Sequence, residues 1–147
     1  MEHTERKAIR LQEYDYSTPG AYFITICTKD RQRILSDIVG DDAHIVPTPI
    51  GRLVEQYMRS IPGIRKYVIM PDHIHMIIHV EQGPMWASAP TSSIPTRVRS
   101  FTPLVTMNLG RAIFQRSYHD HIIRGEQDYR DVWQYIDCNP ARWQEDE

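Results

Sequence analysis

Three histidines alternate along one apolar stretch of the sequence, and their spacing is suited to chemistry. His73, His75 and His79 lie in DHIHMIIHV, residues 72–80. Alternate side chains of a β-strand share a face, so we expect these imidazoles on one side and an aliphatic stripe on the other. Neighbouring positions on that face are about 6.5 Å apart, which lets two imidazoles approach one metal ion. Because an unpartnered buried imidazole costs free energy, the His73–His75 pair favours a metal site over the alternative, in which the histidines are hydrogen-bonded within the protein or face solvent.

A second histidine pair, His119 and His121, has the same spacing in a more polar segment. We interpret it as a structural element or a substrate contact in preference to a metal site. A hydrolytic metalloenzyme built on this pair is the weakest function considered, and it predicts activity on substrates other than nucleic acids. His79 is a rival ligand beside the first pair, but we expect it to support the sheet.

A tyrosine near the end of the chain lies outside the expected core. Residues 128–138 predict a helix with one apolar stripe, formed by Tyr129, Val132, Trp133 and Ile136. Tyr135 lies on the flank of this stripe, so it is either a half-exposed packing residue or a nucleophile. Because the ordinary pKa of tyrosine is about 10, the nucleophilic role needs a cation that polarises the target.

The overall charge is nearly balanced, yet the cations are almost all arginine. The 147 residues include 19 acidic and 17 basic side chains, for a net charge of -2, and only Lys7, Lys29 and Lys66 are lysine. This balance argues against a polycation that coats duplex DNA and leaves arginine-led recognition of nucleic acid open. Two isolated cysteines, and no apolar run of about 20 residues, predict a reduced cytoplasmic protein with no membrane partner.

Several common functional motifs are missing from the sequence. It contains no GxxxxGK[ST] phosphate loop, no GxGxxG and no GxSxG. ATP hydrolysis, dinucleotide chemistry and serine hydrolysis therefore lose their usual sequence support.

Periodicity and turn residues predict the elements that must position these side chains. We expect a buried strand at 21–28, a hairpin with arms 34–39 and 44–46, a helix from Pro49 to just before Pro62, and two strands or one bent strand across 67–80. Helices follow at 97–109, where Pro103 should cause a kink or mark the true start, and at 128–138, closed by Asn139-Pro140.

This order of elements predicts an α+β fold, with helices packed on a mostly antiparallel sheet. Residues 1–147 form one domain in this interpretation. Within it, residues 1–16 are an N-terminal extension, and the proline-rich residues 82–96 form a flexible linker.

Three blocks of sequence together resemble the single-tyrosine HUH transposases, in particular their REP-associated branch. The blocks are AYFITICTKDRQR, YVIMPDHIHMII and FQRSYHDHIIRGEQDYRDVWQYIDCNPARW, in the order of the family. The resemblance implies a ferredoxin-like or RRM-like antiparallel sheet. It matches His73 and His75 to a pair that binds Mg²⁺ or Mn²⁺, Tyr135 to the nucleophile, and Asn139 to the position of a third metal ligand.

The same resemblance implies a metal-dependent endonuclease and strand transferase that acts on single-stranded, hairpin-containing DNA through a 5′-phosphotyrosine. The alternative is an RRM-like module that binds structured nucleic acid without cutting it. We expect DNA contacts from Arg31, Arg33, Arg97, Arg99, Arg116, His121 and Arg124. The sequence leaves open whether the protein acts as a monomer or a homodimer.

Overall fold

The computed structural model describes residues 20–81 and 93–146, and the side chains up to Trp143. Its elements are β1 (Gly20–Cys27), a short 3-10 turn (Lys29–Arg31), β2 (Ser36–Val39), β3 (His44–Pro47), α1 (Pro49–Met58), β4 (Ile64–Ile69), β5 (His73–Val80), α2 (Ile94–Leu109), β6 (His119–Ile123) and α3 (Gly125–Asp146). The expected N-terminal extension, and residues 82–92 of the expected linker, lie outside the described residues.

The main sheet has four strands in the order β4-β5-β1-β6, and every neighbouring pair is antiparallel. The β2–β3 hairpin, which lies between β1 and α1 in the sequence, forms a separate two-stranded sheet. Without this hairpin, the chain from β1 to β6 follows the β-α-β-β-α-β order of ferredoxin-like folds. The predicted α+β class is therefore confirmed.

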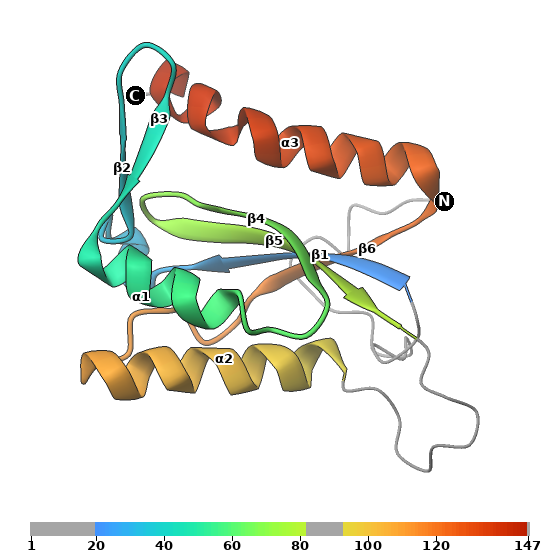
Figure 1. Cartoon of the computed structure of the whole chain (residues 1–147), viewed down its shortest axis with the longest axis horizontal. Coiled ribbons are helices and arrows are strands. Elements are labelled where there is room, and N and C mark those ends of the chain that lie inside the picture. Colours follow the sequence, from blue (N-terminus) through green and yellow to red (C-terminus); the bar gives the residue numbers. More distant parts are fainter. Residues whose placement is uncertain (1–19, 82–92, 147) are drawn as a thin grey trace.

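The helices form layers on the two faces of the sheet. Helices α1 and α2 lie on one face, and α3 crosses the other (Figure 1). The aliphatic side of β5 packs in the larger core on the α1–α2 face, together with Tyr22 and Ile24 of β1 and with Phe101 of α2. The histidine side of β5 consequently faces α3.

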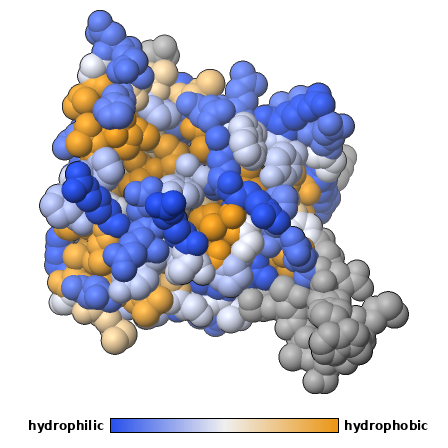
Figure 2. Space-filling view, in the orientation of Figure 1, coloured by the Kyte–Doolittle hydropathy of each residue, from blue (hydrophilic) through white to orange (hydrophobic). Residues whose placement is uncertain are grey.

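Helix α3 is held on the sheet by a second, smaller core. Its buried residues Val132 and Ile136 pack with Val68 and Ile77 of the sheet. Lys66 of β4 fixes one edge of the helix, because its Nζ lies 2.6 Å from Asp137 Oδ1 and 4.2 Å from the centroid of the Trp133 ring. In the same orientation, Figure 2 shows apolar side chains where the β2–β3 hairpin approaches α3.

A glycine lets α1 approach the chain that precedes the hairpin. The helix starts after Thr48, whose hydroxyl accepts a hydrogen bond from Gly51 N at 3.0 Å. A Cβ atom added to Gly51 would overlap the backbone carbonyl of Leu35. This close backbone contact fixes the position of α1 against the segment between β1 and β2.

Helix α2 starts earlier than the sequence predicts. It begins at Ile94 and not at 97, because Ser93 Oγ caps it by accepting from Thr96 N at 3.3 Å, and a proline fits its first turn. Residues 94–96 therefore belong to α2, and the prediction that they are part of a flexible linker is wrong.

Both long helices continue through an internal proline. The helix α2 passes Pro103, and α3 continues past Pro140 to Asp146, so the prediction that α3 closes at Asn139-Pro140 is wrong. Proline costs a helix interior about 3 kcal/mol and removes one backbone donor. In both helices the preceding side chain bonds back one turn: Thr102 Oγ1 to Val98 O at 3.3 Å, and Asn139 Nδ2 to Tyr135 O at 2.9 Å.

Strand β6 is absent from the sequence prediction. Its five residues, HDHII, lie at the sheet edge, and four of them are half-buried. The short segment has no clear alternation of polar and apolar residues, so its pairing with β1 decides its structure. None of the helices in residues 20–81 and 93–146 is long and apolar enough to cross a membrane.

Candidate active site

The His73–His75 pair lies side by side on the face of β5 that α3 covers. The two ring centroids are 4.6 Å apart. His75 is only 4% exposed, whereas His73 is half-buried. Cys27 and Thr25 of β1 stand opposite these two residues in the register of the sheet. The predicted strand alternation thus places both imidazoles where a residue of α3 can meet them.

Each histidine uses its Nδ1 atom for a contact within the protein. Thr25 Oγ1 lies 2.7 Å from His75 Nδ1, and Asp72 Oδ1 lies 2.7 Å from His73 Nδ1. Arg31 Nε donates in turn to Asp72 Oδ2 at 3.2 Å. Contacts of this kind fix the orientation of an imidazole and leave Nε2 for a ligand.

The Nε2 atom of His75 has chemistry that suits a metal ion. It is buried and has no hydrogen-bond partner among the described residues. Burial lowers the pKa of His75 to about 3, and the charge of His73 adds to this effect while the Asn139 side chain opposes it. A neutral imidazole with an unused nitrogen is the form that binds a metal. The donor set therefore fits the divalent ion that the resemblance implies.

Helix α3 brings Tyr135 and Asn139 to the histidines. The Tyr135 ring is 41% exposed, and its centroid lies 5.4 Å from that of His75 and 6.0 Å from that of Phe23. Asn139 is 8% exposed and uses Nδ2 to donate to Tyr135 O. Because the side-chain nitrogen has this partner, the side-chain oxygen of Asn139, Oδ1, is the atom left to bind a metal ion.

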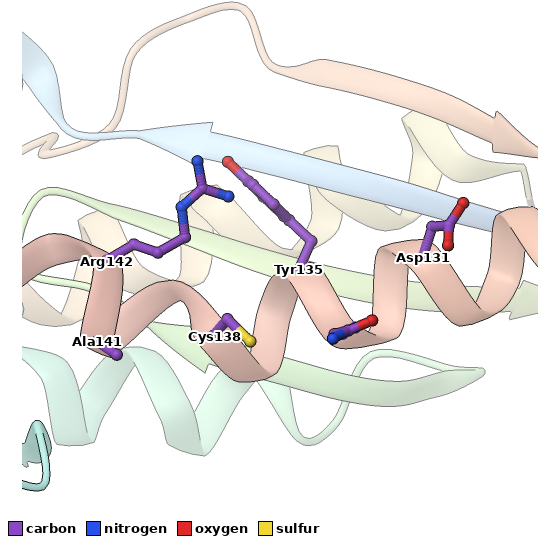
Figure 3. A pocket seen from close by; sticks show the side chains of 6 residues that line it. Asp131, Tyr135, Cys138, Ala141 and Arg142 are labelled. Atoms are coloured by element: carbon purple, nitrogen blue, oxygen red, sulfur yellow. The ribbon is translucent and has the colours of Figure 1, made fainter.

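Arg142 is a further side chain of this site that the sequence analysis missed. Its guanidinium carbon lies 5.6 Å from the centroid of the Tyr135 ring, and the two side chains point toward each other from the same face of α3 (Figure 3). They line a surface hollow of about 520 Å³ with Asp131, Gln134, Cys138 and Ala141. Seven residues, or two helical turns, separate Arg142 from Tyr135. This spacing predicts that the two side chains share a helix face only if the helix continues past Pro140.

The remaining histidines have other contacts. His79 Nε2 lies 2.8 Å from Tyr129 Oη, so this side chain links the sheet to α3. His121 Nε2 lies 2.9 Å from Asp128 Oδ2, which also accepts from Arg124 N at 2.8 Å. His119 is exposed on β6. In the described part of the chain, no group of three or more His, Cys, Asp or Glu side chains is arranged to hold a metal.

The arginines expected to bind DNA fall in different parts of the molecule. Arg31 and Arg33 are exposed at the His73 end of the sheet, where Arg33 lies 5.0 Å from the centroid of the Trp143 ring. Arg116 is exposed before β6, and Arg124 is exposed between β6 and α3. Arg99 is exposed on α2, which lies on the face of the sheet opposite α3 (Figure 1).

For Arg97 the expectation of a DNA contact is wrong. This residue of α2 is only 5% exposed, and its Nη1 donates to Pro62 O at 2.8 Å and to His79 O at 3.0 Å. The guanidinium therefore satisfies backbone carbonyls inside the fold. Spacing alone could not distinguish it from its exposed neighbour Arg99.

The chain is similar in sequence to two proteins of Haemophilus influenzae. No known protein-family profile matches the chain. An uncharacterised protein of Haemophilus influenzae is 32% identical over 167 aligned residues, covering 97% of this chain and 92% of the relative. A candidate REP-associated tyrosine transposase of Haemophilus influenzae is 26% identical, covering 87% of this chain and 74% of the relative.

A solved structure of the REP-associated tyrosine transposase, bound to a REP hairpin, shares the fold. Its TM-score is 0.62 at 23% identity, over 90% of this chain and 74% of the other. The fold is thus that of REP-associated tyrosine transposases. The chain belongs to one family with the 32% identical Haemophilus influenzae protein, and it is related to the REP-associated tyrosine transposases.

Proposed function

We propose that this chain is a metal-dependent, transposase-type endonuclease and strand transferase that acts on single-stranded DNA containing hairpins. One observation carries the proposal: His73, His75, Tyr135 and Asn139 come together on one face of the sheet from β5 and α3. The REP hairpin bound by the structural relative supports a DNA hairpin as the substrate.

The metal ligands in this proposal are His73 Nε2, His75 Nε2 and Asn139 Oδ1. A bound Mg²⁺ or Mn²⁺ would supply Lewis-acid polarisation of the scissile phosphate. Imidazole nitrogen favours the softer metals, so we expect tighter binding of Mn²⁺ than of Mg²⁺ in vitro. Thr25 and the Arg31–Asp72 pair keep the two rings oriented through their Nδ1 atoms.

The reaction that we assign to Tyr135 is the exchange of one phosphoester for another. Its Oη atom attacks the scissile phosphorus, so an Oη–P bond forms and the P–O3′ bond breaks. The phenol proton is lost and the leaving 3′ oxygen gains a proton, which gives a 5′-phosphotyrosine and a free 3′-OH. The number of phosphoester bonds is unchanged, so no nucleotide has to be hydrolysed. Arg142, beside the Tyr135 ring, is placed to donate to the phosphate oxygens.

The alternative function, an RRM-like module that binds nucleic acid without cutting it, has less support. RRM modules stack bases on aromatic side chains of an open sheet face. Here α3 covers the corresponding face, where Val132 and Ile136 pack against Ile77 and Phe23. Bases could not stack on these strands unless α3 moved away.

Substitution of the nucleophile tests the proposed function. Tyr135→Phe keeps the ring that contacts His75 and Phe23, so the fold should persist. We expect this variant to form no covalent adduct with a hairpin-flanked oligonucleotide in Mn²⁺, as read by denaturing electrophoresis, and to retain DNA binding. Tyr129→Phe, which removes a hydroxyl of the same helix, is the matched control and should still form the adduct. An adduct that persists without the Tyr135 hydroxyl would contradict the assignment.

The metal assignment has a separate test. His73→Ala should lose Mn²⁺ binding, measured by calorimetry, together with cleavage. Unchanged Mn²⁺ binding in this variant would show that the histidine pair is not the metal site. The two tests separate the nucleophile from the metal, because Tyr135→Phe leaves all three proposed ligands in place.

A further inference from the structure

Two loops that are far apart in the sequence join at one end of the sheet and carry a cluster of cations. The turn after β1 meets the segment between α2 and β6 at this end (Figure 1). Lys29 N donates to Ile113 O at 2.8 Å, and Gln115 N donates to Cys27 O at 2.8 Å. The resulting basic surface consists of five exposed side chains: Lys29, Arg31, Arg33, Arg111 and Arg116.

The two loops that carry this surface contain few acidic residues. The two segments, residues 28–33 and 110–117, contain one acidic residue, the exposed Asp30. Asp72 is nearby, but it already contacts Arg31 and His73. None of Lys29, Arg111 and Arg116 forms an ion pair with a carboxylate among the described residues. Like charges gathered on one surface repel one another, and a polyanion relieves that repulsion.

The basic surface adjoins the His73 end of the candidate site. Cys27, the last residue of β1, is opposite His73 in the sheet, and Thr28 N donates to Asp72 O at 3.0 Å. Arg33 extends the surface to Trp143 of α3, whose ring centroid is 6.4 Å from that of His73. A chain of phosphates that follows these loops would therefore reach the histidines without crossing the core.

We propose that this basic surface binds the sugar-phosphate backbone of the single strand that enters the site past His73. The inference rests on the proposed function and adds the path of the substrate to it. A near-neutral net charge is compatible with this binding, because the five cations of the basic surface are concentrated at one end of the sheet. Binding by this surface depends on phosphate charge and not on base identity, so sequence preference must come from other contacts.

The test compares salt dependence of binding in two double variants. Both are made in the Tyr135→Phe background, so that no covalent adduct contributes, and the probe is fluorescent oligothymidylate of about 20 nucleotides, longer than typical binding sites. Arg111→Gln with Arg116→Gln removes two cations of the basic surface. Arg52→Gln with Arg59→Gln removes two exposed cations of α1 and its C-terminal end, and gives the same net charge as the first double variant.

We expect the first double variant to bind roughly 60-fold more weakly at about 0.05 M salt, with a log–log salt slope smaller by about 1.4. The control should match the parent protein. Lys29→Gln alone should lower the slope by about 0.7, which guards against a folding defect particular to the arginine variants. Equal slopes for both double variants would overturn the inference. The adduct assay, made with the protein that retains Tyr135, tests the proposed reaction separately. If the adduct forms but the two double variants have equal salt slopes, the proposed binding surface is refuted and the proposed reaction is not.

Discussion

Replacing Thr25 with valine would remove the hydroxyl that contacts His75 while keeping the shape of the side chain. The hydroxyl lies 2.7 Å from Nδ1 of a ring that is 4% exposed, so water cannot easily replace it. A buried polar atom left without its partner costs about 1–3 kcal/mol, and we expect the free energy of unfolding to fall by that amount. The freed ring can also change tautomer, which should weaken Mn²⁺ binding at the proposed site by about 10–100-fold.

Urea denaturation and calorimetric titration with Mn²⁺ would measure these two effects separately. The matched control is Thr102→Val in α2, on the face of the sheet opposite the candidate site. It removes another half-buried hydroxyl, which donates to Val98 O at 3.3 Å. The control should lose some stability and keep its Mn²⁺ affinity. If Thr25→Val loses stability but binds Mn²⁺ as well as the parent, Thr25 does not orient a metal ligand, and our reasoning about the Nδ1 contacts fails.

Three other substitutions test the packing, the ionisation and the chemistry. Gly51→Ala should lower the free energy of unfolding by about 1–3 kcal/mol, because the new methyl group overlaps a backbone carbonyl; an unchanged urea midpoint would contradict the close contact. Burial and the hydrogen bond to Glu55 raise the pKa of Tyr67 to about 12, so its contribution to stability should be complete below about pH 10 and lost as the pH rises to about 12. Tyr67→Phe should abolish that alkaline loss in pH-dependent denaturation. Arg142→Gln should slow single-turnover adduct formation by Tyr135 about 100-fold, and an unchanged rate would exclude a phosphate contact.

The strand alternation of β5 was the most reliable signal in the sequence. Period-two spacing placed His73 and His75 on one face, and the structure puts their rings side by side. The same logic failed for β6, whose five residues have too little contrast between faces. Alternation of polar and apolar residues predicts a strand that buries one complete face. An edge strand such as β6 forms because it pairs with a strand far away in the sequence, which a local pattern does not show.

The extent of α3 was the largest error, and it hid part of the site. Proline usually breaks a helix, yet the packing of α3 on the sheet outweighs the cost at Pro140. Without the last turns of α3, Arg142 and Trp143 could not be related to Tyr135 and His73. The proposed ligand Asn139 was found through the family resemblance, since an asparagine before proline otherwise indicates a helix end.

The position of α3 after all strands of the main sheet in the sequence has a consequence for how the protein is made. Translation proceeds from the N-terminus, so the histidine strand and the whole four-stranded sheet emerge from the ribosome before the tyrosine helix. During that interval the sheet face of Phe23 and Ile77 has no cover, while the proposed nucleophile does not yet exist. A nascent chain that lacks α3 would therefore lack the proposed nucleophile, and the proposed site is completed only once α3 has been synthesised.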